Sequence, residues 1–212
     1  DDILTPLQIP ANGETFRSIS ADQWMTCGVT DSGKVVCWGV FYGDLLEATP
    51  PTVMGSDEDW ASVDVGYRNV CAIKQDGTLW CNGDNSMGGL GQGDLGLGSD
   101  AFLQVGTATD WAHVSVGADQ ACAIDTSNDL YCWGRNVEGE VGVPIKATTA
   151  AVTTPTQVGA GRNWVDVSAG GSQYSLSYSS HTCALDADGT VACWGTSGLG
   201  QLGNGEHYQA SY

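Results

Sequence analysis

The sequence predicts an all-β fold built from four copies of one repeat. Its eight cysteines fall into four pairs with the same ten-residue spacing. Segments such as "WVDVSA" and "VCAI" alternate apolar and polar residues with the period of two that is typical of strands. No window places apolar residues at helical spacing, so we expect almost no helix. The pairs are Cys27 with Cys37, Cys71 with Cys81, Cys122 with Cys132, and Cys183 with Cys193.

Aligning the cysteine pairs brings further positions into register. An aromatic residue lies eleven positions before the first cysteine in three copies and nineteen before it in the fourth, which indicates an eight-residue insertion there. A short segment that predicts a strand precedes each copy ("TPLQI", "TPPTV", "FLQV" and "TPTQV"). The period of about 45 to 60 residues is typical of propellers and solenoids. The chain is thus one repeat domain, 1–212, with approximate units 5–48, 49–101, 102–154 and 155–212.

The residues between paired cysteines predict a tight hairpin. If Cys183 and Cys193 lie directly opposite each other on two antiparallel strands, residues 187–189 remain as a three-residue loop. Such loops favour a type I turn followed by a left-handed residue, usually Gly. The last loop residue is Gly in three copies and Asn, the next-best left-handed residue, in the third. These residues are Gly33, Gly77, Asn128 and Gly189.

Directly opposed cysteines predict four cross-strand disulfides, one in each pair. Opposed residues on neighbouring strands have Cβ atoms about 4.5–5.5 Å apart, which is close to the disulfide range. Zinc sites usually place two cysteines about two to four residues apart, so the wider spacing disfavours a metal. Reduced thiols in the core remain the alternative. Cysteines in matched pairs indicate an oxidising compartment.

The chain is strongly acidic, with 7 basic and 25 acidic residues and a net charge of −18. Binding to phosphates needs clustered Lys and Arg, so we expect no nucleic-acid partner and no docking on anionic membranes. No apolar stretch is long enough for a membrane-spanning helix. The first residues, "DDILTPLQIP", lack the features of a signal peptide. We therefore expect an extracellular or cell-surface protein whose signal peptide has been removed.

The fourth copy, "HTCALDADGTVACWGTSGLGQLGNG", resembles the regulator of chromosome condensation repeat through "HTCAL", "WG" and "GQLGNG". The similarity covers nearly the whole chain, more weakly in the other copies. There "GQLG" becomes "GGLGQG" at 88–93 and "GEVG" at 139–142, and the family His is replaced by Met25, Asn69 and Gln120. The resemblance implies a β-propeller of four-stranded blades. The cysteines stand where the family usually has an apolar and a small residue, as in a disulfide-bearing extracellular branch.

The resemblance also raises the question of how the propeller closes. The family commonly has about seven blades, whereas this chain supplies about four. The chain is a partial propeller from a longer protein, or copies of it close a ring, or it forms an open arc with exposed strand edges. We expect a longer protein or an oligomer. In each blade the fourth strand is expected to come from the start of the next unit.

Binding residues concentrate on loops over a rigid scaffold. The loops between the first and second strands and between the third and fourth strands share one rim. The insertion "GSQYSLSYSS" at 171–180 enlarges one of these loops, and its Tyr and Ser content is typical of a binding loop. The alternative is a surface loop without a partner. The predicted partner-binding residues are Trp24, Tyr67, Arg68, Tyr174 and Tyr178.

Six tryptophans recur at two repeat positions and are predicted to pack in the core between blades. Those of "CWG" are Trp38, Trp133 and Trp194, and those that lead the units are Trp60, Trp111 and Trp164. The second unit departs from this pattern because Asn82 stands where the other units have the Trp of "CWG".

Enzymatic chemistry has little support in the sequence. There is no Gly-x-Ser-x-Gly elbow and no His-Glu-x-x-His helix. "DADG" at 186–189 lacks the ligands of a calcium loop, and the Gly-rich stretch 84–100 lacks the Lys-Ser/Thr of a phosphate-binding loop. Weak calcium binding by the Asp residues of that stretch remains open. We predict no catalytic residues, no metal site and no cofactor.

The function predicted from these features is that of a non-enzymatic, secreted or cell-surface module that binds a protein or assembles with itself. The alternative is a secreted enzyme inhibitor, since the resemblance includes propellers that inhibit β-lactamases with aromatic loop residues. The family's nuclear role, nucleotide exchange on a small GTPase, is disfavoured because disulfides would not survive a reducing nucleus. An ultraviolet photoreceptor would need a "GWRHT" motif, which is absent.

Overall fold

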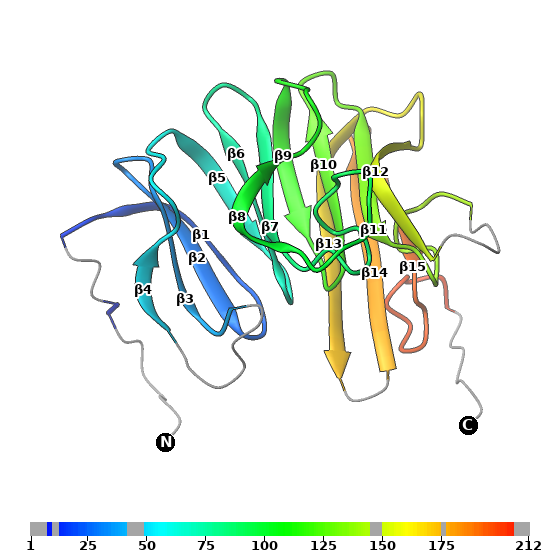
Figure 1. The fold of residues 1–212 in the computed structure, drawn as a ribbon. Coiled ribbons are helices and arrows are strands. Elements are labelled where there is room, and N and C mark those ends of the chain that lie inside the picture. The colour runs from blue at the N-terminus through cyan, green and yellow to red at the C-terminus, as the bar shows by residue number, and fades with distance from the viewer. Residues whose placement is uncertain (1–7, 10–12, 42–48, 145–149, 175–176, 206–212) are drawn as a thin grey trace.

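The computed structural model describes residues 8–9, 13–41, 49–144, 150–174 and 177–205. These residues form fifteen strands in four antiparallel sheets, which Figure 1 shows side by side in an arc like the blades of a propeller. The predictions of an all-β fold and of about four blades are confirmed. In this part of the chain there is no helix that is long and apolar enough to cross a membrane.

The strands of each blade pair in the order of the sequence. The first blade contains β1 (Phe16–Ala21), β2 (Met25–Thr30), β3 (Val35–Gly39) and β4 (Thr49–Val53). The second contains β5 (Trp60–Val65), β6 (Asn69–Lys74), β7 (Leu79–Gly83) and β8 (Ser99–Gln104). The third contains β9 (Trp111–Val116), β10 (Gln120–Asp125), β11 (Leu130–Arg135) and β12 (Ala151–Val158). The fourth contains β13 (Trp164–Tyr174), β14 (Ser177–Asp186) and β15 (Val191–Gly195), three strands in the described residues.

The predicted hairpin register is confirmed in all four blades. In each, the two cysteines lie directly opposite each other on the second and third strands. The last loop residue has a positive φ in every copy, and Asn128, at 65°, is the one non-Gly residue with a positive φ in the described chain. The carboxylate of Asp125 accepts the backbone N–H groups of Ser127 and Asp129, both at 2.9 Å. These bonds hold the turn that Asn128 ends.

The opposed cysteines are disulfide-bonded, and no cysteine is free. Each bond joins the second strand to the third near the middle of its sheet. The bonds link Cys27 to Cys37, Cys71 to Cys81, Cys122 to Cys132, and Cys183 to Cys193.

Burial of the disulfides follows the number of strands in each blade. In the three four-stranded blades, both members of every pair are completely buried, with 0% exposure. Cys37, Cys81 and Cys132 are covered because their strands, β3, β7 and β11, each pair with a fourth strand. Cys183 and Cys193 are half-buried, because no fourth strand lies beside β15 in the described residues.

The hydrophobic core lies between the blades. Apolar side chains of the first blade, including Met25 and Val29, pack against Trp60 and Val63 of the second blade. Two further clusters join the second blade to the third and the third to the fourth. The first strands β1, β5, β9 and β13 contact one another in sequence along the arc. Each blade is therefore stabilised by its neighbours, as in other repeat folds.

A half-buried carboxylate links the first strands of three blades. Asp64 on β5 accepts hydrogen bonds from the Ser20 hydroxyl on β1 and, at 2.7 Å, from the Val116 backbone N–H on β9. Burial raises the pKa of Asp64, while the hydrogen bonds from Ser20 and Val116 oppose the rise. A carboxylate in this position fixes the spacing of three neighbouring strands.

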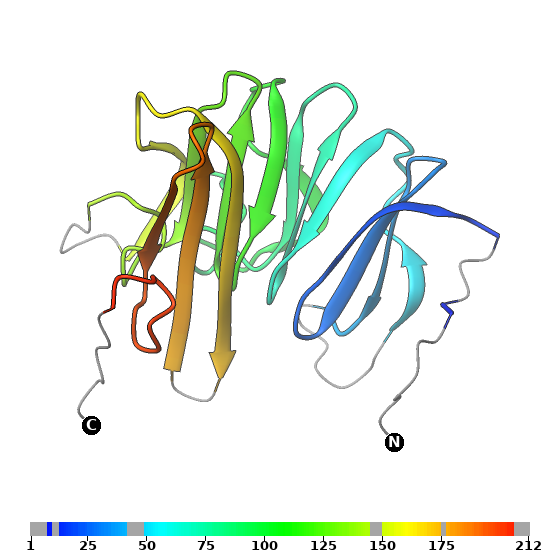
Figure 2. The ribbon, with the colours of Figure 1, turned by 180° about the vertical axis from the view of Figure 1, so that it is seen from behind.

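The insertion in the fourth blade forms paired strands, so the prediction that it enlarges a loop is wrong. β13 and β14 continue the same ladder from Gly171, opposite Ser180, to Tyr174, opposite Ser177. Figures 1 and 2 show the paired ends of these strands reaching beyond the ends of β9 and β10. The added residues extend an existing hairpin because its backbone N–H and C=O groups can pair as the ladder grows.

Four of the six recurring tryptophans are buried in the core as predicted. Trp60, Trp111, Trp133 and Trp164 are 0–7% exposed. Trp38 and Trp194 are only half-buried. Trp194 still packs against the core between the third and fourth blades, so the prediction is corrected for Trp38 alone. Trp38 lies on the first blade, which no sheet precedes in the described residues. Trp194 lies on β15, beside which the described residues place no fourth strand.

Candidate protein-binding rim

The loops between the first and second strands are tied to the ends of the third strands. In each blade the last residue of the third strand, or the residue after it, donates its backbone N–H to a carbonyl of that loop or its extension. The pairs are Val40 to Trp24 (2.8 Å), Asp84 to Arg68 (3.4 Å), Arg135 to Asp119 (2.9 Å) and Thr196 to Ser180 (2.9 Å). We call the edge formed by these residues and their loops the loop rim. The three-residue turns lie at the opposite ends of the strands.

Three of the five predicted binding residues lie on the loop rim with described side chains. Trp24 is 47% exposed, and Tyr67 and Arg68 are half-buried. The Arg68 guanidinium lies 5.0 Å from the centre of the Tyr67 ring. Its Nη1 lies 3.3 Å from Oδ2 of Asp84. The structure thus brings Tyr67 and Arg68 together and places Trp24 on the equivalent loop of the preceding blade.

The other two predicted residues, Tyr174 and Tyr178, lie on the fourth blade. Their backbones form the paired ends of β13 and β14, with Tyr174 opposite Ser177 and Tyr178 opposite Gln173. Their side chains are outside what the structure describes. Their part in binding therefore stays a prediction.

Two pairs of opposite charges occupy equivalent positions of neighbouring blades. The second blade carries Arg68 and Asp84, and the third carries Asp119 and Arg135, with the charges exchanged. Burial raises the pKa of Asp119, and the nearby Asp84 carboxylate raises it further, while Arg135 and Arg68 oppose the rise. The predicted patch held Arg68 alone. The other three charges become visible when the residues three positions before and three positions after each cysteine pair are aligned.

The raised pKa of Asp119 predicts a pH-dependent effect on stability. Because the folded protein holds this proton more firmly than the unfolded chain, the group's contribution to stability falls as pH rises through its folded pKa. We expect Asp119→Asn to raise the Tm at pH 7 by about 2–4 °C and to change it little near pH 4. Calorimetric melts across this pH range measure the effect.

Asp188 offers a control, because its pKa is shifted in the opposite direction. Hydrogen bonds from the Thr190 hydroxyl and backbone N–H lower the pKa of this exposed carboxyl. Asp188→Asn should therefore lower the Tm slightly at pH 7. A lower Tm for Asp119→Asn at pH 7 would show that the two arginines stabilise the charged carboxylate more than burial disfavours it.

A buried ion pair anchors the loop between β11 and β12, which contacts the fourth blade. The Glu140 side chain is 0% exposed and pairs with Arg135, which is 7% exposed. The Glu140 backbone carbonyl accepts the indole N–H of Trp194 and the hydroxyl of Thr182, both at 2.9 Å. Burial raises the pKa of Glu140, and the Arg135 charge opposes the rise. Glu140 is not among the residues predicted from the sequence, where it stands in "GEVG", a variant of the family's "GQLG".

The histidines in the described residues make structural contacts. His113 Nε2 lies 3.3 Å from both the Val167 carbonyl oxygen and Oδ1 of Asp166. Burial lowers the pKa of His181. Within the described ranges no three His, Cys, Asp or Glu side chains gather where they could hold a metal ion.

The radial sheets and the shared loop rim define a β-propeller. The chain belongs to the family of the Regulator of chromosome condensation (RCC1) repeat, whose models match residues 60–88, 111–140, 177–201 and 127–176. The resemblance stated from the fourth copy is thereby confirmed. Over 227 aligned residues, the chain is 28% identical to the Ultraviolet-B receptor UVR8 of Arabidopsis thaliana, covering 100% of this chain and 48% of the receptor.

Solved structures share the fold at lower sequence identity. Human WBSCR16 aligns with a TM-score of 0.69 and 15% identity over 90% of this chain and 50% of its own. Prp20p of Saccharomyces cerevisiae aligns with a TM-score of 0.63 and 18% identity over 92% of this chain and 61% of its own. The chain thus spans about half the length of the receptor and less than two thirds of Prp20p.

Proposed function

We propose that this chain is a non-enzymatic module that binds a protein partner through the loop rim. The observation that carries the proposal is the exposed Trp24 on the loop rim, which also presents Tyr67 and Arg68. Tyr, Trp and Arg are the residue types that dominate binding energy at protein interfaces. Rigid blades hold these side chains in place, so little conformational entropy is lost on binding.

Relatives of the same fold support a protein partner. Prp20p has been characterised for its binding to Gsp1p and histones, and Kap60 has been crystallised bound to the same yeast protein. For this chain the net charge of −18 disfavours nucleic acid. A positively charged or aromatic protein surface fits the loop rim better.

The proposed location is outside the cell or on its surface. The support is the set of four disulfides, one in each blade. Structural disulfides persist in oxidising compartments and are rare in the reducing cytosol and nucleus. The same argument disfavours nuclear exchange on a GTPase as the function of this chain.

A secreted enzyme inhibitor is the second candidate. It is favoured by the long β13–β14 hairpin, whose paired end carries Tyr174 and Tyr178. An inhibitor should bind one enzyme as a soluble monomer, and the double variant of Tyr174→Ala with Tyr178→Ala should weaken inhibition. An assembly module should instead form oligomers, which light scattering after size-exclusion chromatography would detect. If the double variant inhibits as well as the parent, the hairpin is not the inhibitory element.

Site-specific photo-crosslinking tests the proposed binding surface. We expect a photo-reactive phenylalanine at position 24 or 67 to capture a partner from the native environment, whereas one at Ser32, on a turn of the opposite rim, should not. With the captured partner purified, the double variant of Trp24→Ala with Arg68→Ala should weaken its affinity at least about tenfold. Equal capture at all three positions, or unchanged affinity of the double variant, would contradict the proposal.

A further inference from the structure

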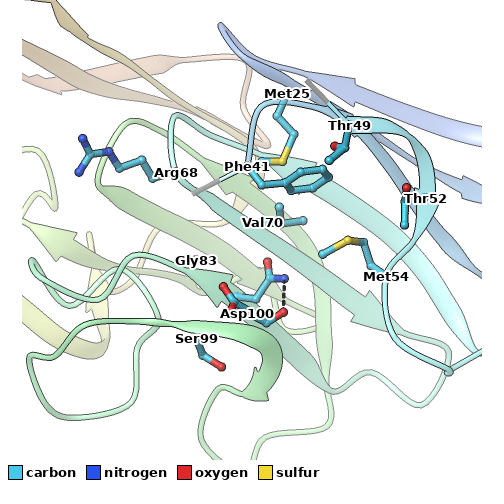
Figure 3. Close-up of a pocket in the computed structure, with 11 residues that line it drawn as sticks. Met25, Phe41, Thr49, Thr52, Met54, Arg68, Val70, Gly83, Ser99 and Asp100 are labelled. Carbon is cyan, nitrogen blue, oxygen red and sulfur yellow. Dashed lines mark hydrogen bonds between the residues drawn. The ribbon is translucent and has the colours of Figure 1, made fainter. Parts of the chain in front are cut away.

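A pocket of about 280 Å³ opens between the first and second blades, beside the loop rim. Its wall is mainly apolar and includes Met25, Phe41, Met54 and Val70. Figure 3 shows these side chains together, with Asp100 and Ser99 at the other side. The buried side chain of Asn82 also lines the pocket, and its Nδ2 donates to the Asp100 carbonyl at 3.3 Å.

The other blades have a tryptophan at the position equivalent to Asn82. In the third and fourth blades the residue after the second cysteine of the pair is Trp133 or Trp194. Each indole N–H donates at 2.9 Å to a carbonyl of the preceding blade's loop: Trp133 to Gly89 and Trp194 to Glu140. The tryptophan therefore fills the space between two blades and ties the loop of one blade to the strand of the next.

One wall of the pocket corresponds to the surroundings of those tryptophans. Met54 and Val105 hold equivalent positions, since each donates its N–H to the third strand of its blade, to Val35 and Leu79 respectively. A Cβ built on Gly91 would lie 3.0 Å from Val105 Cγ1 and 3.2 Å from Trp133 Nε1, so that valine and indole are close neighbours.

The fourth blade repeats this arrangement. A Cβ built on Gly142 would lie 2.8 Å from Trp194 Nε1 and 2.9 Å from Val158 Cγ1. Between the first and second blades, Met54 takes the place of the valine and Asn82 that of the indole. The pocket is thus the space that a tryptophan occupies at the next two blade interfaces.

We propose that this pocket binds an indole side chain presented by a protein partner. That the indole comes from a protein rests on the function proposed above, whereas the pocket itself does not. A cavity of about 150 Å³ is enough for benzene, so this volume has room for an indole ring. Thioethers make favourable contacts with aromatic rings, and Met25 and Met54 supply two. The hydroxyl oxygens of Thr49 and Thr52 can accept the indole N–H.

The methionines of the chain report binding in this pocket. It has three methionines, of which Met25 and Met54 line the pocket and Met87 does not. We expect N-acetyl-L-tryptophanamide to shift the ¹³C-methyl NMR signals of Met25 and Met54 and to leave Met87 unchanged, with a dissociation constant of about 1 mM. N-acetyl-L-leucinamide should bind at least about tenfold more weakly, because it cannot fill the space with a flat ring.

Two substitutions of Asn82 show whether a loss of probe binding comes from a filled pocket or from an unfolded protein. Asn82→Trp restores the repeat pattern and should abolish the methionine shifts while keeping or raising the Tm. Asn82→Ala leaves the space open and should still bind the probe. Absence of probe shifts in the parent protein, equal shifts with the leucine amide, or binding that persists in Asn82→Trp would each overturn the proposal.

The same variants distinguish this proposal from the proposed function. If the probe binds and Asn82→Trp lowers partner affinity at least about tenfold, both stand. If no partner is captured on the loop rim but the probe still shifts Met25 and Met54, the pocket is an indole site and the proposed function fails. If a partner is captured but the probe does not bind, the loop rim stands and the pocket proposal fails.

Discussion

Reduction of the four disulfides is expected to unfold the protein at 37 °C. Each disulfide closes a hairpin loop with a sequence separation of 10, and a loop of this size stabilises by roughly 2–3 kcal/mol in the chain-entropy model. The loops do not overlap, so their contributions should nearly add. Their sum of about 8–12 kcal/mol is comparable to the whole stability of a typical domain, about 5–15 kcal/mol.

Two measurements check this prediction. The intact mass of the native protein should lie eight hydrogens below the all-thiol mass, because all eight cysteines are paired. Tryptophan fluorescence melts, recorded with and without reductant, should then show loss of the cooperative transition after reduction.

Single disulfides provide a graded control. Replacing both Cys122 and Cys132 by Ala should lower stability by about 2–3 kcal/mol and leave the other blades folded. The matching replacements of Cys27 and Cys37, or of Cys71 and Cys81, should cost about the same. An unchanged melt after complete reduction would show that packing between the blades alone sustains the fold. Free thiols in the intact mass, rather than an unchanged melt, would remove the main support for an extracellular location.

The fold was predictable where one local pattern occurs four times. The spacing of the cysteines specified the hairpin register, and the Gly or Asn that ends each turn supplied an independent check. Asn128 shows why this works: its φ of 65° is a backbone conformation that few side chains adopt. Pairing of the second strand with the third is local in sequence, so local residues specify it.

Features that depend on neighbouring blades were less predictable. The insertion at 171–180 has the Ser and Tyr content of a binding loop, yet its backbone continues the β13–β14 ladder. Composition alone does not distinguish the two, because polar residues are common in both exposed strands and loops. Trp38 and Trp194 have the sequence context of core residues, and their exposure follows from which sheets lie beside them.

The candidate site was predictable only where the repeat pattern places its residues. Trp24, Tyr67 and Arg68 could be placed on one rim by counting strands. The replacement of tryptophan by Asn82 was visible in the sequence, but the pocket was not, since its walls come from two blades. The pairing of Arg135 with Glu140 also depends on how the loop folds back over the third strand.

Removal of the Glu140 side chain is the second change with a large expected effect. Glu140→Ala leaves the guanidinium of Arg135 in a site where only 7% of that side chain is exposed. Breaking a buried ion pair by removing one partner costs about 3–5 kcal/mol. The substitution also removes the acceptor of the Glu138 backbone N–H, which bonds to Oε2 of Glu140 at 2.8 Å. Urea unfolding should show the loss as a lower midpoint with an unchanged slope.

We expect Glu140→Ala to destabilise its own loop before it destabilises the whole fold. The Glu140 carbonyl holds the indole of Trp194 and the hydroxyl of Thr182, so hydrogen exchange should accelerate first in the 136–142 loop and in β14. Glu138→Ala is the matched control, since Glu138 is an exposed acid two residues away and its loss should change stability by less than about 0.5 kcal/mol.

A double variant separates charge from packing at this site. Replacing both partners by apolar residues of similar size, Arg135→Met together with Glu140→Leu, removes the buried charges and should recover most of the stability lost in Glu140→Ala. If the double variant is as unstable as Glu140→Ala, the ion pair itself holds the loop on the fourth blade. If Glu140→Ala costs no more than Glu138→Ala, the Glu140 carboxylate does not hold the loop, and its other hydrogen bonds, including those of the Glu140 carbonyl to Trp194 and Thr182, suffice.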